Sequence, residues 1–442
     1  MVAKYFLHIT IYRAEPLPKS LSCRPEYAHQ LPPGFWFLVD DDNQVVVEPA
    51  LLFLIDRFIK QGRYKGKHTH KAMAYDLADW WQYLVERGIS WADAETDLLV
   101  EYRESRLATI SRQTHETLKA STVNRRLSAV LAFYRWAHGR NLFYHSTLDE
   151  LEVRTRMREI DSDPLSHTRS GVFHQTVSTL MAEDDADGRV SVRVINANGH
   201  WKLLQSELGP LPTEQSADDP RPSRDRLAAE LSFWTGLRVD EVAKLSTLQI
   251  LNLLPADDAL PHEMLAVVVT KTKRLKARTV FVPVYLIREL LHYIEHERKE
   301  GLTAGAKHRV KKHNLLFVNS ASANHHAGKP VHPDTFDRKF RAAVLRAGLV
   351  QHVEKTDPDT RQMYLTRDVR YTFHDLRHSF AIYLYLSLEA AGNAAPWLEV
   401  SQRLGHSYLK TTTDIYLAHL EVNRRAINAE VYAATRSRWS GD

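Results

Sequence analysis

The sequence predicts a mainly α-helical protein of several domains, in which a helical domain precedes a mixed α+β domain with a small β-sheet or hairpin. The chain has 442 residues, more than one hydrophobic core ordinarily holds. Apolar residues recur at three- and four-residue spacing over long stretches, the pattern of amphipathic helices. In the second half, two β-rich runs flank a strongly basic turn, which is typical of a hairpin.

Composition narrows the class of protein. Hydrophobic residues make up 44% of the chain and aromatic residues 10%, so a folded chain is expected. Lysine and arginine outnumber aspartate and glutamate by 59 to 54, a balance compatible with a nucleic-acid partner. The single cysteine, Cys23, excludes a disulfide framework and a cysteine-based zinc site within one chain. Because no stretch resembles a membrane helix or a signal peptide, we expect a cytoplasmic protein of the bacterial cytosol and nucleoid, with no membrane partner.

The first half of the chain predicts a β-rich segment followed by helices. Residues 1–45 contain two strand-like runs, the second broken by a turn at Asp40–Asn43, and are expected to cover the next domain. Residues 46–145 carry helical periodicity in ALLFLIDRFI, MAYDLADWWQYLVERG and TVNRRLSAVLAFYRWAHG. They are expected to form a compact helical domain.

The second half begins with a segment of mixed character. Residues 146–222 are polar and proline-rich, and we interpret them as a linker with an insertion. Residues 223–442 are predicted to form the α+β domain with a C-terminal tail. Within it, two helices meet at Gly236, and Val268–Val282 forms the hairpin.

The segment TGLRVDEVAKL offers a phosphate-binding arginine. A side-chain nucleophile can break a phosphodiester if cations neutralise the phosphate oxygens and an acid protonates the leaving oxygen. The guanidinium fork matches phosphate geometry. Arg238 follows the break at Gly236, and Glu241 lies on the same helical face. Taken alone, Arg238 is better explained as the partner in a surface ion pair.

The segment FHDLRHSFA places a candidate acid or base beside a second cation. His374 and Arg377 are three residues apart and share one face of a helix. Phe373, Leu376 and Phe380 are available to bury the other face. On its own, this pattern is better explained as an amphipathic helix with solvated charges.

The segment RLGHSYLKTTTDIY offers a nucleophile. Leu404–His406 is interpreted as a helix end, and Tyr416 lies about a turn and a half into the next helix. It is one of 18 tyrosines, and a helical tyrosine is usually half-buried in a core. Its phenol, with an ordinary pKa of about 10, needs neighbouring cations to act as a nucleophile.

In this order, TGLRxxE, HxLRHxFA and LGHxxxxTTxxxY closely resemble the tyrosine recombinase (phage integrase) family. The resemblance covers residues 50–145 loosely and 223–435 strongly. It implies a helical, SAM-like core-binding domain and a mixed α+β catalytic domain. It also implies that four side chains bind phosphate or transfer protons, namely Arg238, His374, Arg377 and His406. Tyr416 matches the family's nucleophile.

The family also places a lysine on a β-hairpin, about five residues before an arginine. Lys273 before Arg278 fits this pattern and is preferred here. Lys271 remains the rival, because a shift of two residues leaves a side chain on the same face of a strand.

The resemblance implies cleavage and rejoining of double-stranded DNA at a specific recombination site. Tyr416 would form a 3′-phosphotyrosyl link, with no metal, ATP or other cofactor. A homo-tetramer would hold two duplexes, and the tail, residues 418–435, would pack either on a neighbouring subunit or on its own domain.

Two basic runs of the helical domain are the candidates for DNA contact. KGKHTHK and TVNRR place cations beside helix starts, a position that favours phosphate. The residues are Lys65, Lys67, Lys71, Arg125 and Arg126.

Two segments depart from the family pattern, and both are expected to be loops. They are TDPDTRQMYLTRDVR, which looks inserted before His374, and EAAGNAAPW, which makes a long link before His406. Two alternative functions stay open: a type IB topoisomerase-like or telomere-resolving enzyme, and a non-catalytic DNA-binding accessory protein. A metal-dependent nuclease is the weakest alternative, because no carboxylate cluster has metal-ligand spacing.

Overall fold

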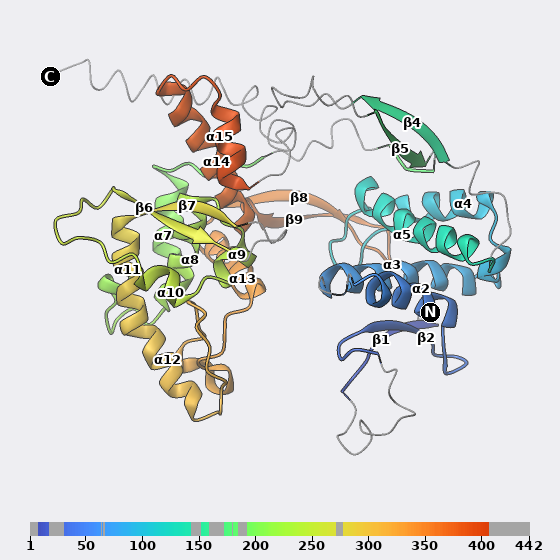
Figure 1. The fold of residues 1–442 in the computed structure, drawn as a ribbon, viewed down its shortest axis with the longest axis horizontal. Coiled ribbons are helices and arrows are strands. Elements are labelled where there is room, and N and C mark those ends of the chain that lie inside the picture. The colour runs from blue at the N-terminus through green and yellow to red at the C-terminus, as the bar shows by residue number, and fades with distance from the viewer. Residues whose placement is uncertain are drawn as a thin grey trace. The chain divides into compact units, whose positions relative to one another are not determined.

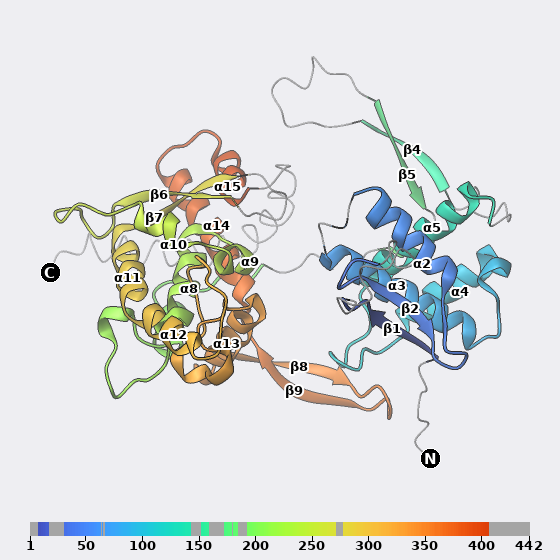
Figure 2. The ribbon, with the colours of Figure 1, turned by 60° about the horizontal axis from the view of Figure 1, so that its bottom comes forward.

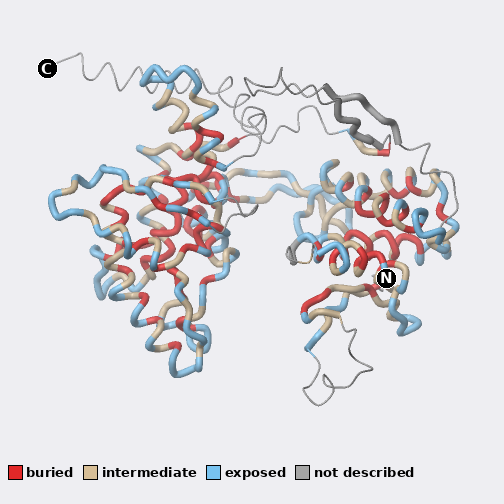
Figure 3. The backbone as a smooth tube through the Cα atoms, in the orientation of Figure 1, coloured by how far each residue is buried: buried red, intermediate tan, exposed pale blue. Residues whose placement is uncertain are grey.

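The computed structural model describes residues 8–16, 31–62, 64, 67–142, 152–158, 172–178, 180–183, 192–270 and 277–405. The chain divides into two compact units, residues 1–188 with 355–364, and residues 189–354 with 365–442. Helices dominate both units, and the sheets are small and antiparallel (Figures 1 and 2). Each unit has a buried core of its own, drawn in red in Figure 3.

The first unit begins with a three-stranded antiparallel sheet. Its strands are β1 (Ile9–Arg13), β2 (Trp36–Asp40) and β3 (Val45–Val46). The turn predicted after β2 is closed by the Asp40 carboxylate, which accepts hydrogen bonds from the backbone N–H groups of Asp42 and Asn43. Phe35 and Leu38 are fully buried in the core of the helices that follow. The sheet therefore covers the helical part of the unit.

Four helical segments form the body of the first unit. They are α2 (Glu48–Leu54), which continues as a π-helical stretch (Ile55–Lys60), α3 (Lys67–Val85), α4 (Thr96–Leu107) and α5 (Ala120–Gly139). Their core is aromatic: the Trp80 ring lies edge-on to Tyr102 at 5.0 Å, and its Nε1 donates a hydrogen bond to the Tyr134 hydroxyl. A hairpin of β4 (Glu152–Arg158) and β5 (Val172–Ser178) follows.

The second unit holds the other helices and two further hairpins. Its helices are α7 (His200–Leu208), α8 (Ser223–Thr235), α9 (Val239–Ala243), α10 (Thr247–Leu251), α11 (Val284–Glu295), α12 (Glu297–Ala306), α13 (Pro333–Arg346), α14 (Phe373–Ala390) and α15 (Pro396–Leu404). Its strands form two pairs, β6 (Met264–Val269) with β7 (Arg278–Pro283), and β8 (Val350–Thr356) with β9 (Met363–Val369). The tip of the β8–β9 hairpin, residues 355–364, belongs to the first unit. α8 is the central helix and packs against α11, α13 and α14.

Two parts of the second unit differ from what the sequence suggests. The stretch before His374, expected to be a loop, forms the turn and the second strand of the β8–β9 hairpin, so that expectation is wrong. α7 lies inside the stretch interpreted as a linker with an insertion, and it contributes to the core. Its Trp201 ring stacks on Phe233 with the centroids 4.4 Å apart.

A short segment without regular secondary structure, residues 192–197, runs along α14. The backbone N–H of Ile195 donates to the Ser379 hydroxyl at 2.8 Å, and that of Ala197 donates to the Tyr383 hydroxyl at 3.0 Å. α14 is thus held on this side by the chain that precedes α7. Among the described residues, no helix is long and apolar enough to cross a membrane.

His70 should make the stability of the first unit depend on pH. The ring is fully buried among Phe35, Phe58 and Tyr64, and burial lowers its pKa from 6.5 to about 4. Because the unfolded chain binds the proton more tightly, stability present above pH 6.5 is lost as the pH falls towards 4, by about 3 kcal/mol. Urea unfolding of the wild type and of His70→Phe across this range measures the difference. Parallel pH profiles for the two proteins would contradict the expectation.

Candidate active site

The three motif segments meet at the side chain of Arg377. This residue is 2% exposed, and its guanidinium donates hydrogen bonds to the carbonyl oxygens of Gly236 and, at 2.7 Å, of Leu404. Gly236 follows the last residue of α8, and Leu404 is the last residue of α15. One side chain of α14 therefore satisfies the carbonyl groups that two other helix ends leave unpaired.

Glycine is required at both of these helix ends. Gly236 and Gly405 adopt left-handed backbone conformations with φ of +67°. A Cβ atom at Gly236 would lie 2.4 Å from Cδ1 of Phe380, and one at Gly405 would lie 2.9 Å from Cδ of Arg278. The glycines of TGLR and LGH thus end their helices, as predicted. They also let α14 approach the end of α8, and β7 approach the end of α15.

Arg238 is held by a carboxylate that also binds a second arginine. Arg238 is the N-cap residue of α9, and its backbone N–H donates to the Glu241 carboxylate at 2.9 Å. Its guanidinium lies 3.4 Å from the other oxygen of Glu241. Arg278 of β7 donates two hydrogen bonds of 2.7 Å to the same carboxylate. Glu241, which is 2% exposed, therefore joins the start of α9 to the base of the β6–β7 hairpin.

The Glu241 carboxylate stays ionised. Burial by itself would raise the pKa of Glu241, but the hydrogen bonds and charge of Arg278, together with those of Arg238, lower it below its ordinary value. Two arginines therefore face one carboxylate, which leaves an excess of positive charge at this place. Such an excess favours binding of an anion.

His374 lies in the first turn of α14, where it is fixed by the cap of that helix. The Asp375 carboxylate accepts hydrogen bonds from the backbone N–H and the hydroxyl of Thr372, at 2.7 and 2.9 Å. Desolvation by the surrounding protein, followed by the charges of Arg377 and Arg238, lowers the pKa of His374 from 6.5 to about 4. The three described side chains of the predicted set thus lie together, and the histidine is neutral at pH 7.

The remaining predicted residues of the site lie outside the described part of the chain. They are Lys271, Lys273, His406 and Tyr416. The described residues that border these gaps lie around Arg278. Val269 pairs with Arg278 at the base of the predicted hairpin, and Gly405 ends α15 against Arg278. The Arg403 guanidinium also lies 4.0 Å from the centroid of the Phe281 ring, which fixes α15 on β7.

The predicted DNA-contacting residues of the first unit have varied surroundings. The Lys71 ammonium lies over the rings of Trp36 and Tyr75, at 5.2 and 5.6 Å from their centroids. Arg125 and Arg126 of α5 form ion pairs with carboxylates of α3, namely Asp76 and Asp79. Lys65 and the side chain of Lys67 lie outside the described residues.

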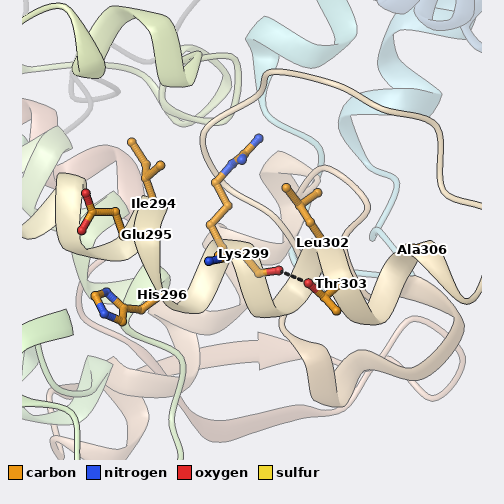
Figure 4. A pocket seen from close by; sticks show the side chains of 8 residues that line it. Ile294, Glu295, His296, Lys299, Leu302, Thr303 and Ala306 are labelled. Carbon is orange, nitrogen blue, oxygen red and sulfur yellow. Dashed lines mark hydrogen bonds between the residues drawn. The ribbon is translucent and has the colours of Figure 1, made fainter.

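The described part of the chain holds no metal centre, and its pocket lies away from the motif residues. No group of three or more His, Cys, Asp or Glu residues there could hold a metal ion. An open pocket runs along α11 and α12, where the Thr303 hydroxyl donates to the Lys299 carbonyl at 2.8 Å (Figure 4). None of the motif residues lines it, so it is separate from the candidate active site.

The pairing of Glu241 with Arg278 is the part of the site that the sequence did not predict. Glu241 was expected to hold Arg238, and Arg278 served only to locate the hairpin lysine. The available signal was a charged residue, Arg278, at the start of the apolar run TVFVPV. A buried arginine needs buried hydrogen-bond acceptors, and here the Glu241 carboxylate supplies them.

Removal of the Arg377 side chain should destabilise the second unit. Arg377→Leu leaves two buried carbonyl groups without donors, which should lower the free energy of unfolding by about 2–4 kcal/mol. Arg341→Leu is the matched control, because its ion pair with Asp368 is largely exposed and should contribute less than about 1 kcal/mol. Urea denaturation measures both. Equal losses in the two variants would contradict the role of Arg377.

The low pKa of His374 can be observed directly. In the free protein, NMR of ¹⁵N-labelled histidine should show His374 neutral down to about pH 4. His374→Gln assigns the signal. Arg238→Gln should raise this pKa because it removes one of the two nearby positive charges. Titration of His374 at its ordinary pKa in the wild type would contradict both the burial and the positive charges to which its low pKa is attributed.

Comparison with known proteins identifies a family for both parts of the chain. The catalytic domain of the phage integrase family matches residues 210–422, and its N-terminal SAM-like domain matches residues 56–141. Transposase A from transposon Tn554 of Staphylococcus aureus is 24% identical over 404 residues, which cover 87% of this chain and 91% of that protein.

A solved structure shares the fold. It is the XerH site-specific recombinase bound to palindromic difH substrate in a post-cleavage complex, with a TM-score of 0.51 and 16% identity. The alignment covers 88% of this chain and 89% of that one. The helical fold with small antiparallel sheets agrees with the prediction. With its paired catalytic and SAM-like domains and its ordered motifs, the chain belongs to the phage integrase family of tyrosine-type site-specific DNA recombinases.

Proposed function

We propose that this recombinase cuts and rejoins strands of double-stranded DNA through Tyr416, at the specific site of a mobile genetic element. The Tyr416 hydroxyl attacks a backbone phosphorus, the bond to the 5′-oxygen breaks, and a 3′-phosphotyrosyl link forms. The 5′-hydroxyl of a partner strand then attacks the link and releases Tyr416. The phosphate bond energy is conserved in the link, so that no ATP is required.

The side chains around Arg377 take defined roles in this reaction. Arg238 and Arg377 neutralise the charge that develops on the phosphate oxygens, and His406 adds a hydrogen bond. His374, neutral before DNA binds, assists proton transfer at Tyr416. Lys273 of the hairpin, or its rival Lys271, protonates the leaving 5′-oxygen.

The single observation that carries the proposal is the contact of Arg377 with both Gly236 and Leu404. It brings together the segments that hold Arg238, His374 and the start of LGHSYLKTTTDIY. A motif that matched only by chance would have no reason to converge on one buried guanidinium.

The assembly is proposed as a homo-tetramer that holds two duplexes in the cytoplasm. The relative from Tn554 is named a transposase, and the XerH complex contains a recombination-site substrate, which supports a DNA site as the partner. In the first unit, Lys65, Lys67, Lys71, Arg125 and Arg126 are proposed to contact the DNA backbone. For Arg125 and Arg126 this requires exchange of their ion pairs for phosphate.

A nicked suicide substrate that carries the protein's own site tests the mechanism. In the presence of EDTA, the wild type should form a denaturant-resistant adduct with the 3′-end of the DNA. Tyr416→Phe should form none, while it binds the same DNA with similar affinity. The adduct should require Lys273 unless the leaving group is a 5′-phosphorothiolate, whose departure needs no acid. Adduct formation by Tyr416→Phe, or its abolition by EDTA, would rule out the mechanism.

A further inference from the structure

A positively charged surface of the second unit lies outside the motif segments. Residues 301–332 contain four lysines and one arginine and not a single aspartate or glutamate. Their charge of +5 equals the formal net charge of the whole chain, so that all other residues together balance to zero. The basic excess of this protein is therefore local.

The fold gathers this charge from two segments. The first is the loop after α12, where Lys307, Arg309, Lys311 and Lys312 are exposed. The second is the stretch 325–329, in which His325 and His326 are exposed and Lys329 is half-buried. We call these seven side chains the basic patch. No ion pair to any of its lysines or its arginine occurs among the described residues.

Close backbone packing holds the two segments together. A Cβ atom on Gly305 would lie 2.5 Å from the carbonyl oxygen of Ala327, so that only glycine lets α12 approach the second segment. The His313 ring lies 3.0 Å from the carbonyl oxygen of Gly328 and links the two segments a second time. The cations are thus presented by a rigid base rather than by two independent loops.

The electrostatics of the patch point to an anion. The charge of His325, with desolvation and the charge of Lys329, lowers the pKa of His326 below its ordinary value. Like charges that repel one another in this way are stabilised when a polyanion binds. The patch is also remote from the candidate active site within the same unit, since α12 and α15 lie at opposite ends of it in Figures 1 and 2.

We propose that the basic patch binds the sugar-phosphate backbone of duplex DNA away from the cleaved phosphate. The proposal rests on the recombinase function, which brings long duplex DNA to this unit. In this proposal the basic patch strengthens DNA binding and positions the duplex, and it takes no part in strand cleavage. Several lysines and one arginine without acidic partners suit a row of phosphates, which they contact without reading the base sequence.

The test compares how strongly the DNA affinity depends on salt in matched variants. The neutralised variant carries Lys307→Gln, Arg309→Gln, Lys311→Gln and Lys312→Gln, and the control carries Lys307→Arg, Lys311→Arg and Lys312→Arg. On a long duplex that contains the site, the slope of log affinity against log salt should become shallower by about 3 to 4 in the neutralised variant, because each phosphate contact contributes roughly 0.9. The control should keep the wild-type slope.

Four outcomes distinguish the proposal from its alternatives. An unchanged slope in the neutralised variant overturns the proposal. If the neutralised variant fails to assemble into oligomers while its salt slope is unchanged, the proposal is also overturned. The partner of the patch is then an acidic protein surface. Formation of the Tyr416 adduct at saturating enzyme and low salt should be unaffected by the four substitutions. If no protein forms the adduct but the slope still changes, the recombinase mechanism fails while DNA binding by the patch stands.

Discussion

The buried guanidinium of Arg377 is the contact on which the catalytic unit depends. It joins α14 to the C-terminal ends of α8 and α15, which are far apart in the sequence. A buried charge is costly unless it is fully hydrogen-bonded, and helix C-termini supply carbonyl groups with partial negative charge. The same contact therefore closes two helices and fixes the position of a cation. In the proposed reaction, the fold positions the phosphate-binding arginines before DNA arrives, so that little reorganisation is needed.

Charge at the site is arranged to receive an anion. Arg238 and Arg278 share the single carboxylate of Glu241, while His374 stays neutral beside Arg238 and Arg377. A bound phosphate would offset the nearby positive charge and raise the pKa of His374, which would bring it into the range useful for proton transfer. Glu241 also holds the base of the β6–β7 hairpin, so that Arg278 of this hairpin and Arg238 are positioned by one carboxylate.

Local features of the site could be predicted from the sequence, and long-range contacts could not. Gly236 and Gly405 mark helix ends because a left-handed residue is a local requirement, and His374 and Arg377 share a helix face through their spacing. The Glu241–Arg278 pair joins residues brought together only by tertiary packing. The β8–β9 hairpin was missed because its strands show little burial on either face and thus lack apolar alternation.

A crystal structure of the protein with a nicked DNA site and vanadate would be the sharpest test of the proposed mechanism, because vanadate reproduces the pentacoordinate transition state. The proposed mechanism requires a bond between vanadium and the Tyr416 oxygen. It also requires hydrogen bonds from Arg238 and Arg377 to the equatorial oxygens, with the Arg377 contacts to Gly236 and Leu404 preserved. A vanadate held by another nucleophile, or an Arg377 that has left both carbonyl groups, would contradict it.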